Sequence, residues 1–442
     1  MVDRLPNADL DAALADAEGR YIAANPKSQT RHLAARASLP GGNTRSVMWY
    51  EPFPVALSGG TGARLKDIDG HDYVDFVSEY SAGLYGHSDP AIQATMIAVV
   101  QGGVALGGPN MFEAALGAEL VARFPALERV RFTNSGTEAN IMAISTARAV
   151  TGRGAVVAMR EGYHGGVLTF AHGGSALNLP FPWLMADYND VAGTEALLRA
   201  QAADIACVIL EPMLGGGGCI RATDAYLAML RRVTAEIGAL LIFDEVMTSR
   251  LHVGGMQSIT GVTPDLMTLG KYIGGGASFG AFGGRADLMD RFDPANPGAF
   301  GHGGTFNNNI LSMAAGHTGL TKVLTPEASA RFNALGDRLR LAMQDRIDAH
   351  GVAASMIGYG SLFNLHFLPK DQVSPSAVEH ADLRPGKLWH LEMMLAGLYV
   401  TPRGMIAMSL PHQDADVDAF ITTFDRFLED YRSILPKTEA LA

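Results

Sequence analysis

The sequence predicts an α/β protein with two domains, and three observations support this prediction. The chain has 442 residues, 48% of them hydrophobic, which is enough for two buried cores. From about residue 90, helical stretches alternate with short runs rich in Val, Ile and Leu, a pattern typical of a parallel or mixed sheet covered on both faces. The preceding part has the pattern of a small antiparallel sheet, and the part after residue 326 is mostly helical.

The elements before residue 90 come first. A helical start is followed by a loop at residues 40–44 and by strand-like segments at 55–57, 63–67 and 73–76. Asp69 and Gly70 separate the last two segments, and Asp-Gly between alternating apolar residues is a hairpin signal.

The central and final parts follow. Helices are expected at 90–101, 111–124 and 138–151, and strands at 130–133, 155–159, 206–210, 239–243, 266–269 and 279–283. Two further helices are expected at 326–350 and 414–431, with strands at 361–367 and 406–410 between them.

Charge and cysteine content narrow the class of protein. A net charge of −11 gives no general attraction for nucleic acid or an anionic membrane, so neither is expected as a partner. Cys207 and Cys219 are too few for a disulfide framework and have no His or Cys cluster around them, so no metal site is expected. The start lacks a secretory signal and no apolar run is long enough to span a membrane, so we expect a cytoplasmic protein.

The segment TNSGTEAN at residues 133–140 follows an apolar run and opens a helix. Small hydroxyl residues and a glycine leave backbone N–H groups directed at an anion, so a phosphate group fits there. The same residues also fit an ordinary N-cap, with Glu138 completing a capping box.

Asp244 and Lys271 each follow an apolar run, where open α/β sheets bind ligands. The carboxylate could pair with a cationic ring nitrogen, a lysine or Mg²⁺, or cap a helix, whereas Glu245 beside it fits structural hydrogen bonds. A lysine at the end of a buried strand is unusual, because desolvation penalises the charged ammonium. Desolvation also lowers the pKa of the lysine and makes the neutral amine nucleophilic, as Schiff-base chemistry requires. A surface loop lysine is the alternative.

Together these motifs occur in a specific order, with Tyr163-His164 and Glu211-Pro212 between the phosphate segment and Asp244, and with Lys271 following. Over residues 30–435 this order resembles the class III (omega) aminotransferases, which have PLP fold type I. The resemblance implies pyridoxal 5′-phosphate (PLP) as cofactor. It also implies a large domain at residues 76–320, with a mixed, mostly parallel sheet flanked by helices, and a smaller α+β domain from residues 1–75 and 321–442.

Within this class, residues 43–46, 78–81, 162–167, 244–250, 304–309 and 401–404 are similar to the aromatic β-amino acid (β-phenylalanine) aminotransferases. That resemblance implies transfer of an amino group from an aromatic β-amino acid to a 2-oxo acid, 2-oxoglutarate or pyruvate, in a PLP/pyridoxamine phosphate ping-pong cycle. Intramolecular transfer, as in glutamate-1-semialdehyde aminomutase, and a non-catalytic PLP-fold binding protein are the alternatives. A Rossmann oxidoreductase is excluded, because no G-x-G-x-x-G opens a helix after the first strand of the α/β region.

The resemblance implies a role for each cofactor residue. Lys271 forms the Schiff base and its freed amine moves a proton, while Asp244 keeps the pyridine nitrogen protonated. The phosphate is held by Ser135, Gly136 and Thr137.

Three further residues complete the implied cofactor site. Tyr163 stacks on the cofactor ring, and Glu211 orients the network around Asp244 or satisfies local donors. Thr305 contributes to the phosphate site of the neighbouring subunit, so a homodimer with shared active sites is expected.

Substrate binding requires a cation for the carboxylate. Arg45 and Arg403 match the family positions, and an arginine suits bidentate carboxylate recognition. Trp49, Tyr50 and Tyr80 either form an aromatic-accepting pocket or pack in the core or the dimer interface. Weaker candidates are Arg250 and His164, while loop hydrogen bonds are expected for His87 and His302.

Overall fold

The computed structural model describes residues 9–438 and divides into two compact units. Unit 1 contains the chain up to residue 80, residues 86–88 and the chain from residue 332 onward. Unit 2 contains residues 81–85 and 89–331. Residues 1–8 and 439–442, which the sequence assigns to the smaller domain, lie outside the described residues.

Unit 2 is built on a seven-stranded sheet with the order β4-β10-β9-β8-β7-β5-β6. β10 is antiparallel to both of its neighbours, and the other pairs are parallel, which confirms the predicted mixed, mostly parallel sheet. The strands are β4 (Arg129–Thr133), β5 (Ala155–Met159), β6 (Trp183–Ala186), β7 (Ile205–Leu210), β8 (Leu240–Asp244), β9 (Leu266–Gly270) and β10 (Gly280–Gly284).

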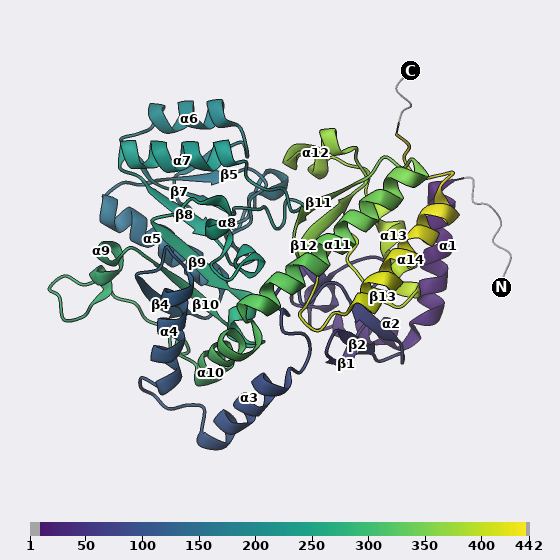
Figure 1. Cartoon of the computed structure of the whole chain (residues 1–442), viewed down its shortest axis with the longest axis horizontal. Helices are drawn as coiled ribbons and strands as arrows, with labels where there is room; N and C mark the ends of the chain where they lie inside the picture. The colour runs from purple at the N-terminus through teal and green to yellow at the C-terminus, as the bar shows by residue number, and fades with distance from the viewer. Residues whose placement is uncertain (1–8, 439–442) are drawn as a thin grey trace. The chain divides into compact units, whose positions relative to one another are not determined.

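Helices cover this sheet. One buried cluster joins Ala143 of α5 to Cys207 and Ile242 of the strands, and the alternate residues Val208 and Leu241 are also fully buried, so both faces of the sheet are covered. Figure 1 shows α6 and α7 side by side along the sheet, next to β5 and β7. The helices are α3 (Pro90–Gly102), α4 (Met111–Arg123), α5 (Gly136–Thr151), α6 (Val191–Ala200), α7 (Asp224–Ile237), α8 (Met256–Thr260), α9 (Ala286–Met289) and α10 (Ile310–Thr318).

Unit 1 contains two small sheets, with the orders β1-β2-β3-β13 and β11-β12-β14. Their strands are β1 (Leu57–Thr61), β2 (Arg64–Asp67), β3 (Asp72–Asp75), β11 (Ser355–Tyr359), β12 (Leu362–His366), β13 (Leu398–Tyr399) and β14 (Met405–Ala407). The helices are α1 (Leu10–Ala24), α2 (Pro26–Ala35), α12 (Pro375–Glu379), α13 (Arg384–Leu395) and α14 (Asp414–Tyr431), together with α11 (Pro326–His350), which begins in unit 2. Within residues 9–438, none of the helices is both long enough and apolar enough to cross a membrane.

The antiparallel pairing of β2 with β3 confirms the predicted hairpin, and α11 and α14 have the predicted bounds. The predicted strand at 55–57 is wrong, since β1 starts at Leu57. Val55 is buried without belonging to a strand, whereas β1 is an edge strand with no fully buried residue, so its side chains carry little apolar signal. The sequence interpretation also missed β6, β11 and β13.

Candidate active site

The phosphate-binding candidates lie where β4 passes into α5. Ser135 is the N-cap of α5 and its Oγ accepts a hydrogen bond from the N–H of Glu138 at 3.2 Å, while Glu138 Oε2 accepts one from the N–H of Asn134 at 2.7 Å. The predicted N-cap is therefore present, but the predicted capping box is wrong, because Glu138 accepts from the N–H of Asn134 and not from that of the N-cap Ser135. The Ser135 cap does not compete with anion binding, since the N-terminus of α5, which begins at Gly136, carries the positive end of the helix dipole.

Strand register brings this helix start to the same sheet edge as the lysine and the aspartate. Thr133 of β4 and Gly270 of β9 both pair with Gly280 of β10, and Thr268 of β9 pairs with Asp244 of β8. Neighbouring strands are about 4.8 Å apart, so the three strand ends occupy one short edge.

The glycines at this edge allow a close approach. A Cβ on Gly136 would lie 2.8 Å from both methyl groups of Val246, and a Cβ on Gly270 would lie 3.1 Å from Val246 and 3.5 Å from the Gly136 Cα. Neither position therefore has room for a side chain of its own beside Val246, and the backbone of the start of α5 lies close to that of the end of β9.

Asp244 has a buried carboxylate that accepts hydrogen bonds from several neighbouring groups. Its Oδ2 accepts from Asn140 Nδ2 and from His164 Nδ1, both at 2.8 Å, and its Oδ1 accepts from the Val246 N–H at 3.0 Å. Thr268 Oγ1 lies 2.7 Å from Asn140 Oδ1 and fixes the orientation of that amide. These donors hold the carboxylate in one orientation at the end of β8.

His164 contacts Asp244 directly, a contact that the sequence reasoning did not assign to it. Its ring is buried, Nδ1 donates to Asp244, and Nε2 has no hydrogen-bond partner among the described residues. Asn140 received no role at all, although it belongs to the phosphate-segment motif. The only sequence signal for Asn140 is its position one helical turn after Gly136, which places the two residues on the same face of the helix.

Glu211 lies beside this network. Its carboxylate accepts hydrogen bonds from the N–H of Tyr163 at 3.0 Å and of Gly215 at 2.9 Å. Burial and, to a smaller extent, the charge of Asp244 raise the pKa of Glu211, and His164 opposes this shift, so that the pKa is about 7. Glu211 thus satisfies local donors, one of them on Tyr163, and also lies within electrostatic reach of Asp244. The Tyr163 side chain is 48% exposed.

Lys271 follows β9 directly and has a φ of 53°, a left-handed conformation that is rare for a residue with a side chain. Its Nζ donates a hydrogen bond to Ser81 Oγ at 3.0 Å. Strained backbone of this kind persists only where the surroundings enforce it, and it is concentrated at functional sites. The lysine is therefore not an ordinary flexible loop residue.

Thr305 lies exposed in the loop before α10. In the same loop, Asn307 Oδ1 accepts a hydrogen bond from Asn134 Nδ2 at 3.0 Å, and His302 Nδ1 accepts one from Arg131 Nε at 3.0 Å. The loop is thus tied to the segment that precedes Ser135, and His302 makes the loop hydrogen bond that the sequence suggested.

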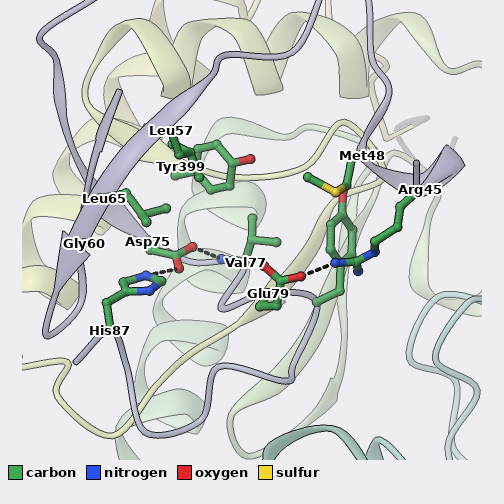
Figure 2. A pocket seen from close by; sticks show the side chains of 12 residues that line it. Arg45, Met48, Leu57, Gly60, Leu65, Asp75, Val77, Glu79, His87 and Tyr399 are labelled. Carbon is green, nitrogen blue, oxygen red and sulfur yellow. Dashed lines mark hydrogen bonds and ion pairs between the residues drawn. The ribbon is translucent and has the colours of Figure 1, made fainter. Parts of the chain in front are cut away.

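The substrate-binding candidates Arg45, Tyr80 and Arg403 all belong to unit 1. Figure 2 shows Arg45 directed at Glu79. Arg45 forms an ion pair with Glu79, and its guanidinium carbon lies 5.4 Å from the centre of the Tyr80 ring. Burial raises the pKa of Tyr80, and the charges of Arg403 and Arg45 oppose the shift, so both arginines act on the same phenol. Arg45 and Tyr80 line a pocket of about 220 Å³.

The other aromatic and histidine candidates lie in different environments, namely the core, the surface and the pocket wall. Tyr50 is buried, its hydroxyl accepts from the Val55 N–H at 3.0 Å, and its ring contacts His390 edge-on, so it packs in the core. Trp49 is 47% exposed. His87 pairs with Asp75 at 2.9 Å in the wall of the pocket.

Comparison with known proteins identifies the family. The model of the family "Aminotransferase class-III" matches residues 46–428. The chain belongs to the class III aminotransferases. A β-phenylalanine transaminase from Variovorax paradoxus is 45% identical over 98% of this chain and 100% of its own length. A glutamate-1-semialdehyde 2,1-aminomutase from Thermomicrobium roseum is 36% identical over 88% of this chain and 94% of its own.

Solved structures agree with this assignment. The structure of a β-phenylalanine aminotransferase from Variovorax paradoxus, at 45% identity, superimposes with a TM-score of 0.96, over 97% of this chain and 100% of the other. The structure of an ω-transaminase from Sphaerobacter thermophilus, at 37% identity, superimposes with a TM-score of 0.85 over 92% of this chain and 98% of the other. This class III aminotransferase therefore has the predicted PLP fold type I and is a PLP-dependent transaminase.

The residues at the sheet edge fit pyridoxal phosphate. The start of α5 suits a phosphate, the buried Asp244 suits a cationic ring nitrogen, and Lys271 supplies a primary amine at the same edge. Gly136 and Gly270 leave room for the Val246 side chain, so that the two backbone segments approach each other at this edge. When bound, the cofactor supplies an electron sink for the carbon that loses a proton.

Proposed function

We propose that this class III aminotransferase transfers the amino group of an aromatic β-amino acid, such as β-phenylalanine, to a 2-oxo acid such as 2-oxoglutarate or pyruvate. The observation that supports this most is the 45% identity, over 98% of this chain and 100% of the other, with a protein named β-phenylalanine transaminase. The two half-reactions follow one another in ping-pong order, since the donor product leaves before the acceptor binds.

In this proposal the residues of unit 2 bind and orient the cofactor. Lys271 attaches it through Nζ and moves a proton to and from the carbon beside the amine, while Asp244 holds the proton on the pyridine nitrogen. Ser135, Gly136 and Thr137 hold the phosphate with hydroxyl and backbone N–H groups.

The remaining cofactor residues act around these. Tyr163 covers one face of the ring, and Glu211 fixes the backbone of Tyr163 through the 3.0 Å hydrogen bond. Thr305 contributes to the phosphate site of the partner subunit.

Arg45 and Arg403 bind the carboxylates of donor and acceptor. A β-amino acid carries its carboxylate one carbon farther from the amine than an α-amino acid does, so two positions must be recognised. Two arginines that act on one tyrosine suit this division. We expect Arg403→Ala to raise KM for one of the two substrates about tenfold or more, since a charged hydrogen bond contributes about 1.5–3 kcal/mol.

The matched control for Arg403→Ala is Arg384→Ala, which removes an exposed arginine of unit 1 that pairs with Asp382. It should leave both KM values unchanged. Full activity of Arg403→Ala with both donor and acceptor would refute the division of work between the arginines.

A half-reaction separates the transaminase from an aminomutase, the second function, which the 36% identical relative favours. The purified protein should show the absorbance of the bound cofactor, and β-phenylalanine alone should bleach it with release of one keto product. An aminomutase instead needs no external acceptor and releases an isomer of its substrate. Lys271→Ala should lose the wild-type cofactor band, and retention of that band would refute the role of Lys271.

The proposal of a homodimer is supported by apolar side chains that are exposed on unit 2. Ile97, Val100, Leu106, Met111 and Phe306, next to Thr305, are all between 55% and 77% exposed. Ile97 and Val100 lie on α3 and Met111 on α4, and both helices contact α10. Exposed apolar side chains on neighbouring elements favour an interaction surface. Met111→Asp places a carboxylate in the first turn of α4, where the helix dipole favours it, so α4 should stay folded while the dimer weakens.

Light scattering with size-exclusion chromatography measures that effect. Leu341→Asp on α11, a residue that is 54% exposed, is the control and should leave the mass unchanged. A Met111→Asp protein with the wild-type mass would refute this surface as the interface.

Two further proposals concern the cellular location and the division into domains. The two buried free cysteines, Cys207 and Cys219, support a reducing, cytoplasmic location. We also propose that units 1 and 2 correspond to the smaller domain and the large cofactor-binding domain. Limited proteolysis tests this division, since a first cut inside residues 89–331 would contradict it.

A further inference from the structure

Ser81 is a buried polar residue beside Lys271 to which the proposed reaction gives no role. Its Oγ accepts the hydrogen bond from Lys271 Nζ at 3.0 Å, and its side chain is fully buried. Its backbone oxygen accepts a hydrogen bond from Arg250 Nη1, also at 3.0 Å. Ser81 therefore lies between a buried guanidinium and the lysine amine.

The backbone at Ser81 is strained. Ser78, Glu79, Tyr80 and Ser81 have φ values of 45°, 52°, 53° and 74°, so four consecutive residues with side chains adopt the left-handed conformation. Lys271 shares this conformation, with a φ of 53°. Both partners of the hydrogen bond are thus held in backbone states that a free chain rarely visits.

Arg250 is one of the groups that hold Ser81 in place. Its side chain is 1% exposed, and burial lowers the pKa of Arg250 to about 9, an effect that Tyr272 and Tyr85 partly oppose. A desolvated guanidinium binds a carbonyl oxygen strongly, because water does not compete for its N–H groups. The position of Ser81 is therefore fixed from the side opposite the lysine.

We propose that Ser81 is a positioning residue for Lys271, whose hydroxyl holds the lysine amine where it exchanges protons with the substrate carbon. A lysine side chain has many rotamers, and an acceptor on a rigid support selects one of them. This inference rests on the proposed role of Lys271 as the residue that carries the cofactor.

The variants Ser81→Ala and Ser81→Gly test it. Both remove the hydroxyl, but glycine also relieves the strain of a φ of 74°, so it keeps the test valid if the alanine variant folds poorly. The matched control is Ser312→Ala. Ser312 is a buried serine of unit 2 whose hydroxyl donates to the Ser278 carbonyl at 2.6 Å.

The decisive measurement is the pH titration of the cofactor absorbance in the holoenzyme. Because the lysine nitrogen is the donor, loss of the acceptor should lower the midpoint by about 0.5–1 pH unit in both variants. The kcat should fall about tenfold with little change in KM. The groups around Lys271 that also titrate or carry charge are Cys219, Tyr272, Arg250 and Asp244, and neither variant replaces them.

The outcomes separate this inference from the proposed function. Borohydride reduction followed by peptide mass spectrometry locates the covalently bound cofactor. Cofactor on Lys271 with wild-type midpoints in both Ser81 variants would overturn the role of Ser81 alone. Cofactor on another lysine would overturn the role of Lys271, and this inference with it. A purely structural serine predicts that glycine and alanine differ in thermal stability while the midpoints stay unchanged.

Discussion

Gly165 offers a sharp test of the phosphate-binding residues. It has a φ of 128°, and a Cβ there would lie 2.2 Å from Thr137 Oγ1 and 2.6 Å from both Thr137 Cβ and Cγ2. Ordinary van der Waals contacts are 3.4 Å or longer, so an alanine at 165 cannot coexist with Thr137 in its present position. Gly165→Ala should therefore displace Thr137 from the start of α5.

The size of the effect follows from two contributions. Left-handed backbone for a residue with a side chain costs about 1–3 kcal/mol, which lowers the stability of the apoprotein. Loss of the Thr137 hydroxyl removes one charge-assisted hydrogen bond to a phosphate, about 1.5–3 kcal/mol. That second term corresponds to a roughly 10–150-fold weaker affinity for pyridoxal phosphate.

Titration of the apoprotein with cofactor, followed by absorbance, measures the affinity, and thermal unfolding of the apoprotein measures the strain. Gly166→Ala is the control, because a Cβ at Gly166 meets nothing within 4 Å. Thr137→Val keeps the shape and removes the hydroxyl, so it should weaken affinity like Gly165→Ala while leaving the apoprotein nearly as stable. If both Gly165→Ala and Thr137→Val bind cofactor as the wild type does, Thr137 does not bind the phosphate.

Three further predictions follow from buried groups. Asp244→Asn keeps the shape of the carboxylate but not its charge, so kcat should fall about 10²–10³-fold, and near-normal steady-state turnover would contradict its role. Burial lowers the pKa of His390 to about 3, whereas an unfolded histidine titrates near 6.5, so stability is present above about pH 6.5 and is lost as pH falls below it. His390→Asn retains a donor near the position of Nδ1 for the Val400 carbonyl without titrating, and urea unfolding between pH 7 and 5 should show a slope that is flatter by up to about 1.4 kcal/mol per pH unit. Tyr50→Phe removes the hydroxyl that accepts from the Val55 N–H, so it should destabilise unit 1 by about 1–3 kcal/mol with unchanged KM values, whereas a raised KM for β-phenylalanine would return Tyr50 to the substrate pocket.

The sheet of unit 2 could be predicted because its strands are buried on both faces. Leu240–Asp244, for example, is apolar up to its last residue, and every one of its residues is buried, so the run itself reveals the strand. The same apolar run also places Asp244 at the strand end. β1 gave no such signal, since residues Leu57–Thr61 are exposed or half-buried and include two adjacent glycines.

The contacts that complete the candidate site could not be predicted in the same way. His164 and Asn140 reach Asp244 across 80 and 104 residues of sequence, and Ser81 reaches Lys271 across 190. Such pairs are set by the register of parallel strands and by loop conformation, which no local pattern encodes. Motif order predicted the residues that we propose to carry the chemistry, but the residues that contact them became visible only in the fold.

Backbone strain explains why local reasoning fails at these positions. Glycine would adopt the positive φ of Lys271 and Ser81 without strain, yet each position carries a side chain. At Lys271 the amine is indispensable for the proposed chemistry, so strain there follows directly from function. At Ser81 a small hydroxyl is retained although glycine would stabilise the turn, which is the pattern expected of a side chain kept for its contact with the lysine. Ser81→Gly should therefore raise the thermal stability of the apoprotein and lower kcat at the same time. A variant that gains stability and keeps full kcat would show that the Ser81 hydroxyl does not position the lysine.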